Sequence, residues 1–406
     1  MPEGNVTKGW GAGIMANIRD RLWEKAGKEG FPLTAAFELL PVCNLSCKMC
    51  YVRKSMKEVQ QEGGLKDGKW WLEKAKEASS YGLLFPLLTG GEPFLHPDFR
   101  QILTGMQDMG MQVSINSNAT LIDRETAKWI GNHVPNRINI TLYGASEKTY
   151  ENLCGDGNAY KKVCDAVQWL KEYQVPVKFN TSITPQNVQD LEEMIRFAKK
   201  VESPIQAAYY MFPPVRRNQD MIGQNDRLTP EEAGLARVKA DFLQGEPEWF
   251  VGMAKRFSYF VPLEKCNLQP DENVKMKMSC RAGHCSFWLD WQGNMRNCGM
   301  YSSVTLSTEN RDFGEVWKEL REQTHKVRYA PVCAVCPNQP LCHSCIAMVA
   351  NECGDINGKP EYLCRMNQAS AKYYQEYLKK IPEEFKVRET LSTGEEVPQN
   401  CGLDEF

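Results

Sequence analysis

The chain lacks the features that mark membrane, secreted and nucleic-acid-binding proteins. Its 406 residues contain no run of about 18 apolar residues, so no membrane-spanning helix is expected. The first residues, MPEGNVTKGWGAG, do not show the charged-then-apolar order of a secretion signal. The formal net charge of −2 gives no general attraction to polyanions. We therefore expect a cytoplasmic protein with no membrane partner and no nucleic-acid partner.

Internal repeats and low-complexity tracts are also absent, and the first half of the chain alternates between two patterns. Apolar runs rich in β-forming side chains alternate with amphipathic helical stretches such as DGKWWLEKAKEASS. The predicted strands are 33–40, 83–90, 111–118, 137–144, 175–184 and 204–212. Strands that alternate with helices imply βα units, so the sequence predicts an α/β fold with a parallel sheet.

Near residue 278 the alternation stops and cysteines become frequent, which predicts a second domain. A helical segment near 229–257 lies before this change, between two turn-rich stretches. The predicted organisation is an N-terminal extension (1–34), the strand–helix domain (35–225), a helical linker (226–277), a cysteine-rich domain (278–376) and a tail (377–406).

Cysteine is abundant, with 16 residues that cluster along the chain. In a long cytoplasmic chain such clusters indicate metal or redox chemistry rather than a disulfide framework. Cys43, Cys47 and Cys50 form a C-x3-C-x2-C pattern directly after the first predicted strand, where a βα barrel has its active-site loops. The spacing alone leaves two interpretations: a 4Fe-4S cluster with one open iron, or a zinc site with a remote fourth ligand.

Three further motifs follow this pattern in order. TGGEP (89–93) comes after the second strand, and NITLYG (139–144) and KFNTSIT (178–184) cover the fourth and fifth. Together with the cysteines they resemble the radical SAM superfamily over residues 35–215. One position departs from the family pattern, because Met49 stands where an aromatic residue is usual and Tyr51 follows the third cysteine.

The resemblance implies a partial (β/α)6 TIM-type barrel that binds a 4Fe-4S cluster and S-adenosylmethionine (SAM). Such an enzyme reductively cleaves SAM to a 5′-deoxyadenosyl radical, which abstracts hydrogen from a substrate. The resemblance implies that Glu92 accepts hydrogen bonds from the methionyl ammonium, and that Thr141 and Asn180 contact the ribose or the carboxylate. The cofactor-binding residues expected in this way are Tyr51, Gly90, Gly91, Glu92, Thr141 and Asn180.

The C-terminal cysteines have the spacing C-x4-C-x7-G-x4-C, then C-x2-C-x5-C-x2-C, then a later cysteine. In isolation this spacing is more typical of a zinc ribbon. Beside the radical SAM motifs it resembles the SPASM extension, a small domain with a β-hairpin, short helices and two auxiliary 4Fe-4S clusters. FWLDWQGNMRNC (287–298) predicts the hairpin.

The resemblance assigns four cysteines to each auxiliary cluster. The first set is Cys280, Cys285, Cys298 and Cys345, and the second is Cys333, Cys336, Cys342 and Cys364. The partition stays open, because the family usually ends this run with C-x3-C and because Cys353 competes with Cys364. The remaining unassigned cysteines are Cys154, Cys164, Cys266 and Cys401. Cys154 and Cys164 lie in helical patterns and are expected to be small core residues.

SPASM proteins mostly act on peptides or proteins, so we expect a ribosomally made precursor peptide or a protein side chain as the substrate. A flavodoxin or ferredoxin is the expected electron donor. Arg216 and Arg217 follow the sixth strand and are expected to form a solvated basic loop, although a substrate contact is also open to them. A tetrapyrrole or a sugar-derived compound is a second candidate substrate, and a zinc-stabilised binding protein is a candidate from another class.

Overall fold

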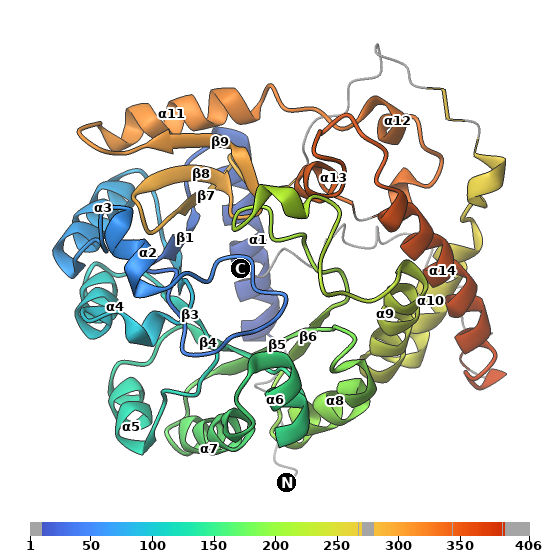
Figure 1. Ribbon diagram of the computed structural model, residues 1–406, viewed down its shortest axis with the longest axis horizontal. Coiled ribbons are helices and arrows are strands. Elements are labelled where there is room, and N and C mark those ends of the chain that lie inside the picture. Colours follow the sequence, from blue (N-terminus) through green and yellow to red (C-terminus); the bar gives the residue numbers. More distant parts are fainter. Residues whose placement is uncertain (1–9, 267, 270–279, 343, 384, 386–406) are drawn as a thin grey trace, which may run out of the picture.

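A parallel sheet forms the centre of the protein, as the computed structural model shows for residues 10–266, 268–269, 280–342, 344–383 and 385 (Figure 1). The first six strands are β1 (Thr34–Glu38), β2 (Phe85–Thr89), β3 (Ser114–Ser117), β4 (Arg137–Thr141), β5 (Val177–Ser182) and β6 (Ile205–Ala208). They pair side by side in chain order, and every neighbouring pair is parallel. The predicted α/β fold with a partial (β/α)6 barrel is therefore confirmed, with each strand inside its predicted range.

Helices between the strands cover the outside of this sheet. They are α2 (Met56–Gln61), α3 (Gly68–Ser80), α4 (Phe99–Asp108), α5 (Arg124–Asn132), α6 (Glu147–Cys154), α7 (Asn158–Glu172) and α8 (Leu191–Lys200). Capping explains several boundaries. The Asp67 carboxylate accepts a hydrogen bond from the Trp70 amide at the start of α3, and Gly155 ends α6 in the left-handed conformation.

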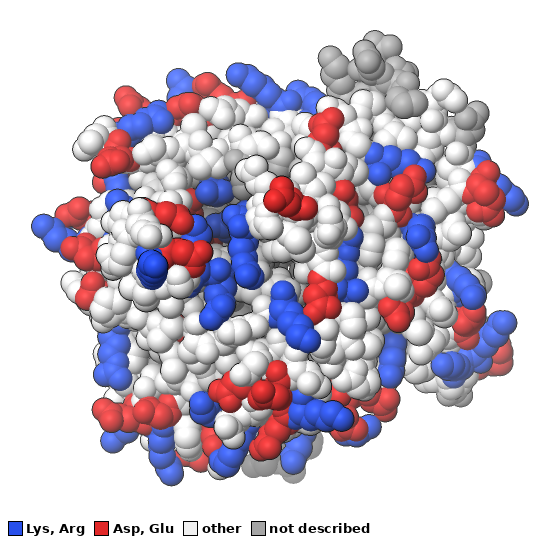
Figure 2. Space-filling view, viewed as in Figure 1, with Lys and Arg blue, Asp and Glu red and all other residues white. Residues whose placement is uncertain are grey.

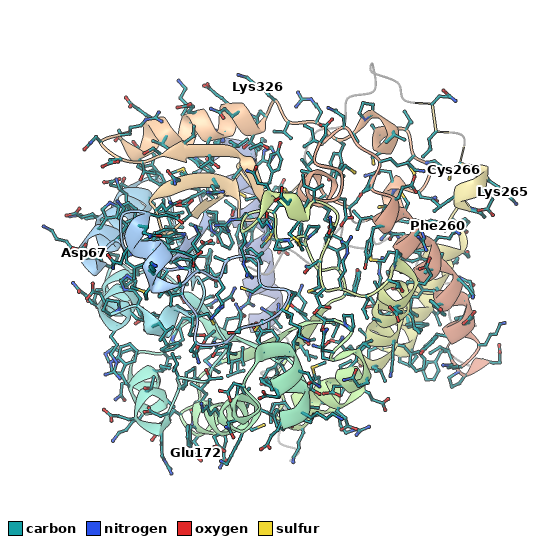
Figure 3. The ribbon with its side chains drawn as sticks, in the orientation of Figure 1. Asp67, Glu172, Phe260, Lys265, Cys266 and Lys326 are labelled. Atoms are coloured by element: carbon teal, nitrogen blue, oxygen red, sulfur yellow. The ribbon has the colours of Figure 1, made fainter. Side chains whose placement is uncertain are left out.

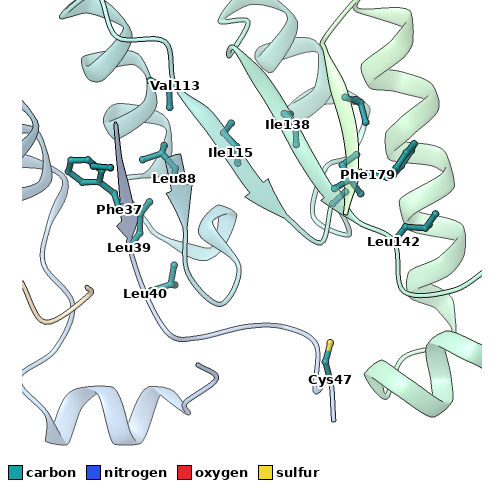
Figure 4. Packing of buried hydrophobic residues seen from close by; sticks show 14 of the residues in the cluster. Phe37, Leu39, Leu40, Cys47, Leu88, Val113, Ile115, Ile138, Leu142 and Phe179 are labelled. Carbon is teal, nitrogen blue, oxygen red and sulfur yellow. The ribbon is translucent and has the colours of Figure 1, made fainter. Parts of the chain in front are cut away.

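Alternation along the strands separates an apolar outer face from a polar inner face. Ile115, Ile138 and Phe179 are buried against the surrounding helices (Figure 4). The residues between them are polar, and their side chains meet on the inner face. There Asn139 Nδ2 donates to Asn116 Oδ1 (2.8 Å), and Lys178 Nζ donates to Gln206 Oε1 (2.9 Å). The barrel interior therefore carries polar groups, as a site for a polar ligand requires.

The cysteine-rich segment begins by extending the same sheet. Its strands are β7 (Ser286–Leu289), β8 (Asn294–Cys298) and β9 (Tyr301–Ser307). Strand β7 pairs in parallel with β1, and β8 and β9 follow as antiparallel neighbours, which confirms the predicted hairpin. Strand β7 thus covers the edge of β1. In an isolated six-stranded sheet this edge would be exposed. The domain boundary at residue 278 stays a prediction.

The remaining helices pack beside and behind the barrel opening. They are α1 (Trp10–Glu29), α9 (Pro230–Gln244), α10 (Pro247–Ser258), α11 (Phe313–Thr324), α12 (Pro331–Ala334), α13 (Ile346–Cys353) and α14 (Glu361–Leu378). Helices α9, α10 and α14 pack together around Phe250, Phe257 and Tyr374. In the parts of the chain that the structure describes, no helix has the length and hydropathy needed to cross a bilayer.

Candidate active site

The loop that follows β1 carries the first three cysteines and is fixed by backbone hydrogen bonds. The Ser46 amide donates to the Cys154 carbonyl (2.9 Å), and the Lys48 amide donates to the Leu153 carbonyl (3.1 Å). Both acceptors lie in the last turn of α6, where carbonyl groups have no partner within the helix. The loop therefore has a defined position at the carboxyl ends of the strands, and Figure 4 shows Cys47 beyond those ends.

Gly90 and Gly91 let the segment after β2 approach the start of this loop closely. The Gly91 amide donates to the Leu40 carbonyl (2.7 Å), and the Glu92 amide donates to the Val42 carbonyl (2.9 Å). A Cβ atom on Gly90 would lie 2.3 Å from the Leu40 oxygen, and one on Gly91 would lie 2.2 Å from the Val42 oxygen. Gly90 also has φ +147°, a conformation that favours glycine. The two glycines thus hold the GGE segment directly against the cysteine loop.

Gly91→Ala is expected to displace the cysteine loop, because the new methyl group would overlap backbone atoms that cannot rotate away. We expect iron bound after anaerobic reconstitution to fall by about four atoms per chain, the content of one cluster. Iron and acid-labile sulfide analysis measures this. Gly252→Ala is the matched control, since a Cβ there meets no atom within 4 Å. Full iron content in Gly91→Ala would show that the close approach is dispensable.

The three thiols of the loop lie near one another and near polar groups of the barrel. Cys43 Sγ accepts hydrogen bonds from the Leu45 amide (3.4 Å) and from Asn118 Nδ2 (3.6 Å). Burial, with smaller contributions from the charges of Glu92, Cys47 and Cys50, raises the pKa of Cys43 to about 12. The Cys43 thiol is therefore protonated at neutral pH without a metal, and metal binding would release its proton.

A 4Fe-4S cluster makes a different demand from a single ion, because each thiolate binds its own iron. Among the described residues, no three His, Cys, Asp or Glu side chains converge on one point as a single ion requires. Three neighbouring thiols on a fixed loop, with polar donors beside them, match the donor set that an iron–sulfur cluster needs.

Glu92 is buried at the centre of the site, with an exposed fraction of 0%. Its Oε1 accepts from the Ser117 hydroxyl (2.8 Å) and the Phe94 amide (3.3 Å), and its Oε2 accepts from the Asn118 amide (2.7 Å). Burial raises the pKa of Glu92 to about 7 in spite of these donors. The carboxylate is therefore held in one orientation, with lone-pair capacity left for one further donor.

The other expected cofactor residues lie at the same end of the barrel. Thr141 and Asn180 are direct partners in the pairing of β4 and β5, at the last positions of that ladder, and both are half-buried. Tyr51 is half-buried beside the loop, and burial raises the pKa of its hydroxyl, with Arg216, Glu38, Cys50 and Cys298 as its charged neighbours. Tyr51 thus lies near both Cys50 and Cys298.

The sequence predicted a solvated basic loop for Arg216, and the structure shows that this prediction is wrong. Arg216 is buried in an ion pair. Its two terminal nitrogens donate to the two Glu38 oxygens (3.0 Å each), and the side chains are 11% and 1% exposed. Trp288 Nε1 donates to Glu38 (2.7 Å), and Arg216 also donates to the Gly299 carbonyl (3.0 Å). This cluster joins the end of β1 to the turn after Cys298. Arg217 remains exposed, as expected.

Arg53 is a functional candidate that the sequence did not indicate. Its Nε is buried and has no hydrogen-bond partner among the residues that the structure describes. A hydrogen bond from Cys154 lowers the pKa of Cys47 against the opposing effect of burial, with a further hydrogen bond from Tyr143 and a smaller contribution from the positive charge of Arg53. Figure 2 shows Lys and Arg side chains gathered near the middle of this face, around a hollow. A guanidinium with a buried Nε that has no partner, close to the cysteine loop, is suited to bind an anionic group.

The C-terminal cysteines form two groups. Burial, with the charges of Cys298 and Cys280, raises the pKa of Cys345 to about 12, so these three thiols are neighbours. Burial and the charges of Cys342 and Cys333 likewise raise the pKa of Cys364 to about 12.

Cys336 completes the second group, because its charge acts on Cys333. Cys353 also acts on Cys333, and Cys266 acts on Cys336, so two unassigned cysteines lie at the edge of this group. Figure 3 shows Cys266 with Lys265 and Phe260 on the side of the molecule that carries α14. The structure does not bring Cys285 into either group. Cys154 is buried, as expected of a core residue, and Cys401 lies outside the described residues.

Residues 37–198 match the model of the radical SAM superfamily. This part of the chain therefore carries a radical SAM domain. This finding favours iron–sulfur chemistry over the zinc-stabilised binding protein that the cysteine spacing alone left open.

Particular relatives fall into two kinds. The AdoMet-dependent heme synthase of Methanosarcina barkeri is 22% identical over 82% of this chain and 96% of its own length. The PqqA peptide cyclase of Bradyrhizobium diazoefficiens is 24% identical over 70% of this chain and 81% of its own. The structure of native anSMEcpe with bound AdoMet and Cp18Cys peptide is similar in fold, with a TM-score of 0.59, 18% identity, and coverage of 87% of this chain and 100% of that one.

Proposed function

We propose that Cys43, Cys47 and Cys50 hold a 4Fe-4S cluster whose open iron binds SAM, and that the C-terminal cysteines hold two auxiliary 4Fe-4S clusters. The observation that carries this proposal is the contact of the cysteine loop with the GGE segment through two backbone hydrogen bonds that only glycine permits. When bound and reduced, the cluster supplies the electron that cleaves SAM to a 5′-deoxyadenosyl radical, which takes hydrogen from the substrate.

The protein's own residues would orient SAM and keep water away. Glu92, fixed by Ser117 and the Asn118 amide, would accept a hydrogen bond from the methionyl amino group. Thr141 and Asn180, side by side at the strand ends, would contact the ribose or carboxylate. Tyr51, half-buried near Cys50 and Cys298, would pack beside the adenine.

Arg53 would pair with the methionyl carboxylate of SAM, since its buried Nε has no hydrogen-bond partner in the described part of the chain and its charge acts on Cys47. Arg53→Gln is expected to weaken SAM binding about tenfold, the effect of losing one charge-assisted hydrogen bond. Equilibrium dialysis with labelled SAM measures the affinity. Lys54→Gln is the matched control, because its ammonium pairs with Glu62 instead. Equal effects of the two changes would mean that Arg53 acts only through the general charge of the loop.

The substrate we propose is a ribosomally made peptide or a protein side chain, which the enzyme would crosslink or oxidise. The similarity to PqqA peptide cyclase supports this choice, as does the fold shared with anSMEcpe in its peptide complex. The auxiliary clusters would accept the substrate electron, and a flavodoxin or ferredoxin in the cytoplasm would reduce the first cluster. Gly299, directly after the hairpin cysteine, has no side chain that could take a proton, so another group would accept the substrate proton.

A tetrapyrrole is the second candidate substrate, because the match to the heme synthase extends over nearly the whole of that protein. The basic groups around the hollow in Figure 2 would suit its carboxylate side chains.

Two probes distinguish the candidates under anaerobic conditions. If the substrate is a peptide, short peptides encoded beside the gene and co-expressed with the enzyme should lose about two mass units per crosslink, and added iron coproporphyrin III should leave 5′-deoxyadenosine formation unchanged. A shift of the porphyrin absorbance together with turnover of the porphyrin would instead establish the tetrapyrrole candidate.

A further inference from the structure

The three thiols of the first C-terminal group come together from separate elements. Cys298 ends β8, and its sulfur accepts a hydrogen bond from the Met300 amide (3.3 Å). Cys345 is the residue directly before α13, and Asn351 of that helix donates to the Met300 carbonyl (2.8 Å). Helix α13 is thereby tied to the turn that holds Cys298. Cys280 completes the group through its charge on Cys345.

Cys285 lies on the opposite face of the sheet. Side chains alternate along a strand, so Cys285 shares its face with Phe287, whose ring packs on Phe313 and Trp317 of α11 (5.5 and 6.0 Å between centroids). On β8, Asn297 points to the same helix and donates to Thr324 Oγ1 (3.2 Å). Cys298, the next residue, lies instead near Arg216, which donates a hydrogen bond to the adjacent Gly299 carbonyl and binds Glu38.

The surroundings of Cys285 are those of a core residue. Its side chain is 2% exposed and packs with Ala26 of α1 and Leu33. Its carbonyl accepts hydrogen bonds from the Leu33 amide (2.9 Å) and the Thr34 amide (3.3 Å), which fix the backbone against the start of β1. Moving this thiol to the other face would break these bonds and empty the apolar site.

We propose that the first auxiliary cluster is held by Cys280, Cys298 and Cys345, and that its fourth iron takes an exchangeable ligand that is not cysteine. This inference rests on the auxiliary clusters of the proposed function and changes the ligand set that the resemblance implied. The fourth position is then open to water or to an oxygen, nitrogen or sulfur atom of the substrate, as at the SAM-binding cluster.

Iron and sulfide content after anaerobic reconstitution tests the assignment. Cys285→Ala and Cys285→Ser are expected to retain about twelve irons, as the unmutated protein does, whereas Cys345→Ala is expected to lose about four. Cys164→Ala, a half-buried helical cysteine outside both groups, is the matched control. Loss of about four irons from a folded Cys285 variant would overturn the proposal. About four irons in the unmutated protein would instead remove the auxiliary clusters themselves, and this inference with them.

A second measurement leaves Cys285 intact and so does not depend on how its variants fold. In the Cys43, Cys47 and Cys50 triple alanine variant only the auxiliary clusters remain. Adding potassium cyanide to the reduced variant is expected to change the electron paramagnetic resonance signal of one cluster and leave the other unchanged, because cyanide binds an iron with an exchangeable ligand. Two unchanged signals would show that both clusters are fully held by the protein.

Discussion

Replacing Cys43, Cys47 and Cys50 together by alanine is expected to reduce 5′-deoxyadenosine formation to background while about eight of about twelve irons stay bound. The reason is that these thiols are the proposed ligands of the one cluster that binds SAM, and both auxiliary groups lie in a separate part of the chain. Anaerobic incubation with SAM and dithionite, followed by chromatography for 5′-deoxyadenosine, measures activity, and iron analysis of the same sample counts clusters.

The matched control for this triple variant is Cys154→Ala. Cys154 is buried next to Cys47 and donates a hydrogen bond to it, but it is not a proposed ligand. It is expected to keep all three clusters and most of the activity. Retention of 5′-deoxyadenosine formation in the triple variant would contradict the assignment of the SAM site.

Arg216→Met is expected to lower the free energy of unfolding by about 3 kcal/mol, because it leaves the buried Glu38 carboxylate without its cation. It should also loosen the turn after Cys298, since Arg216 donates to the Gly299 carbonyl. Urea unfolding under anaerobic conditions, followed by circular dichroism, measures the loss. Arg217→Met is the control, because Arg217 is exposed and its change is expected to stay within about 0.5 kcal/mol.

A double-mutant cycle separates the ion pair from the packing of the Arg216 side chain. Glu38→Gln combined with Arg216→Met removes both charges, so most of the stability lost in the single variant is expected to return. A double variant as unstable as the sum of the two single variants would show that the pair is not coupled, and the stabilising role would then belong to packing alone.

Local patterns were sufficient to predict the barrel. Each of the six parallel strands falls within its predicted range, because apolar β-rich runs between amphipathic helices are typical of βα units. The hairpin at 287–298 was predicted by its alternation and its glycine turn. The pairing of β7 with β1 could not be predicted in this way. Contacts between strands some 250 residues apart leave no signal in local periodicity.

In the candidate site, too, contiguous motifs could be predicted from the sequence, and contacts between distant residues could not. The cysteine loop and the GGE segment are contiguous motifs and could be found in the sequence, and the structure adds that they touch through backbone. Arg216 was expected in a solvated loop because its partner, Glu38, lies 178 residues away. The one available signal was an acidic residue at the end of a fully buried strand whose three central residues are apolar. Arg53 gave no comparable signal in the sequence. That its buried Nε lacks a hydrogen-bond partner depends on the side chains that surround it in the fold.

The proposed exclusion of Cys285 from the first auxiliary cluster rests on the fold and not on the spacing of the cysteines. Its distance from Cys280 and Cys298 along the chain fits a ligand, and only the alternation of side chains in β7 and β8 separates the two faces. Spacing counts residues but does not record on which side of a strand each residue points.

The measurement that tests the central claim most directly is the electron paramagnetic resonance spectrum of the reduced protein before and after addition of SAM. The account predicts that SAM changes the signal of one cluster, and that this change is absent in the Cys43, Cys47 and Cys50 triple alanine variant. A spectrum that SAM leaves unchanged in the reconstituted protein, or a change that persists in the triple variant, would contradict it.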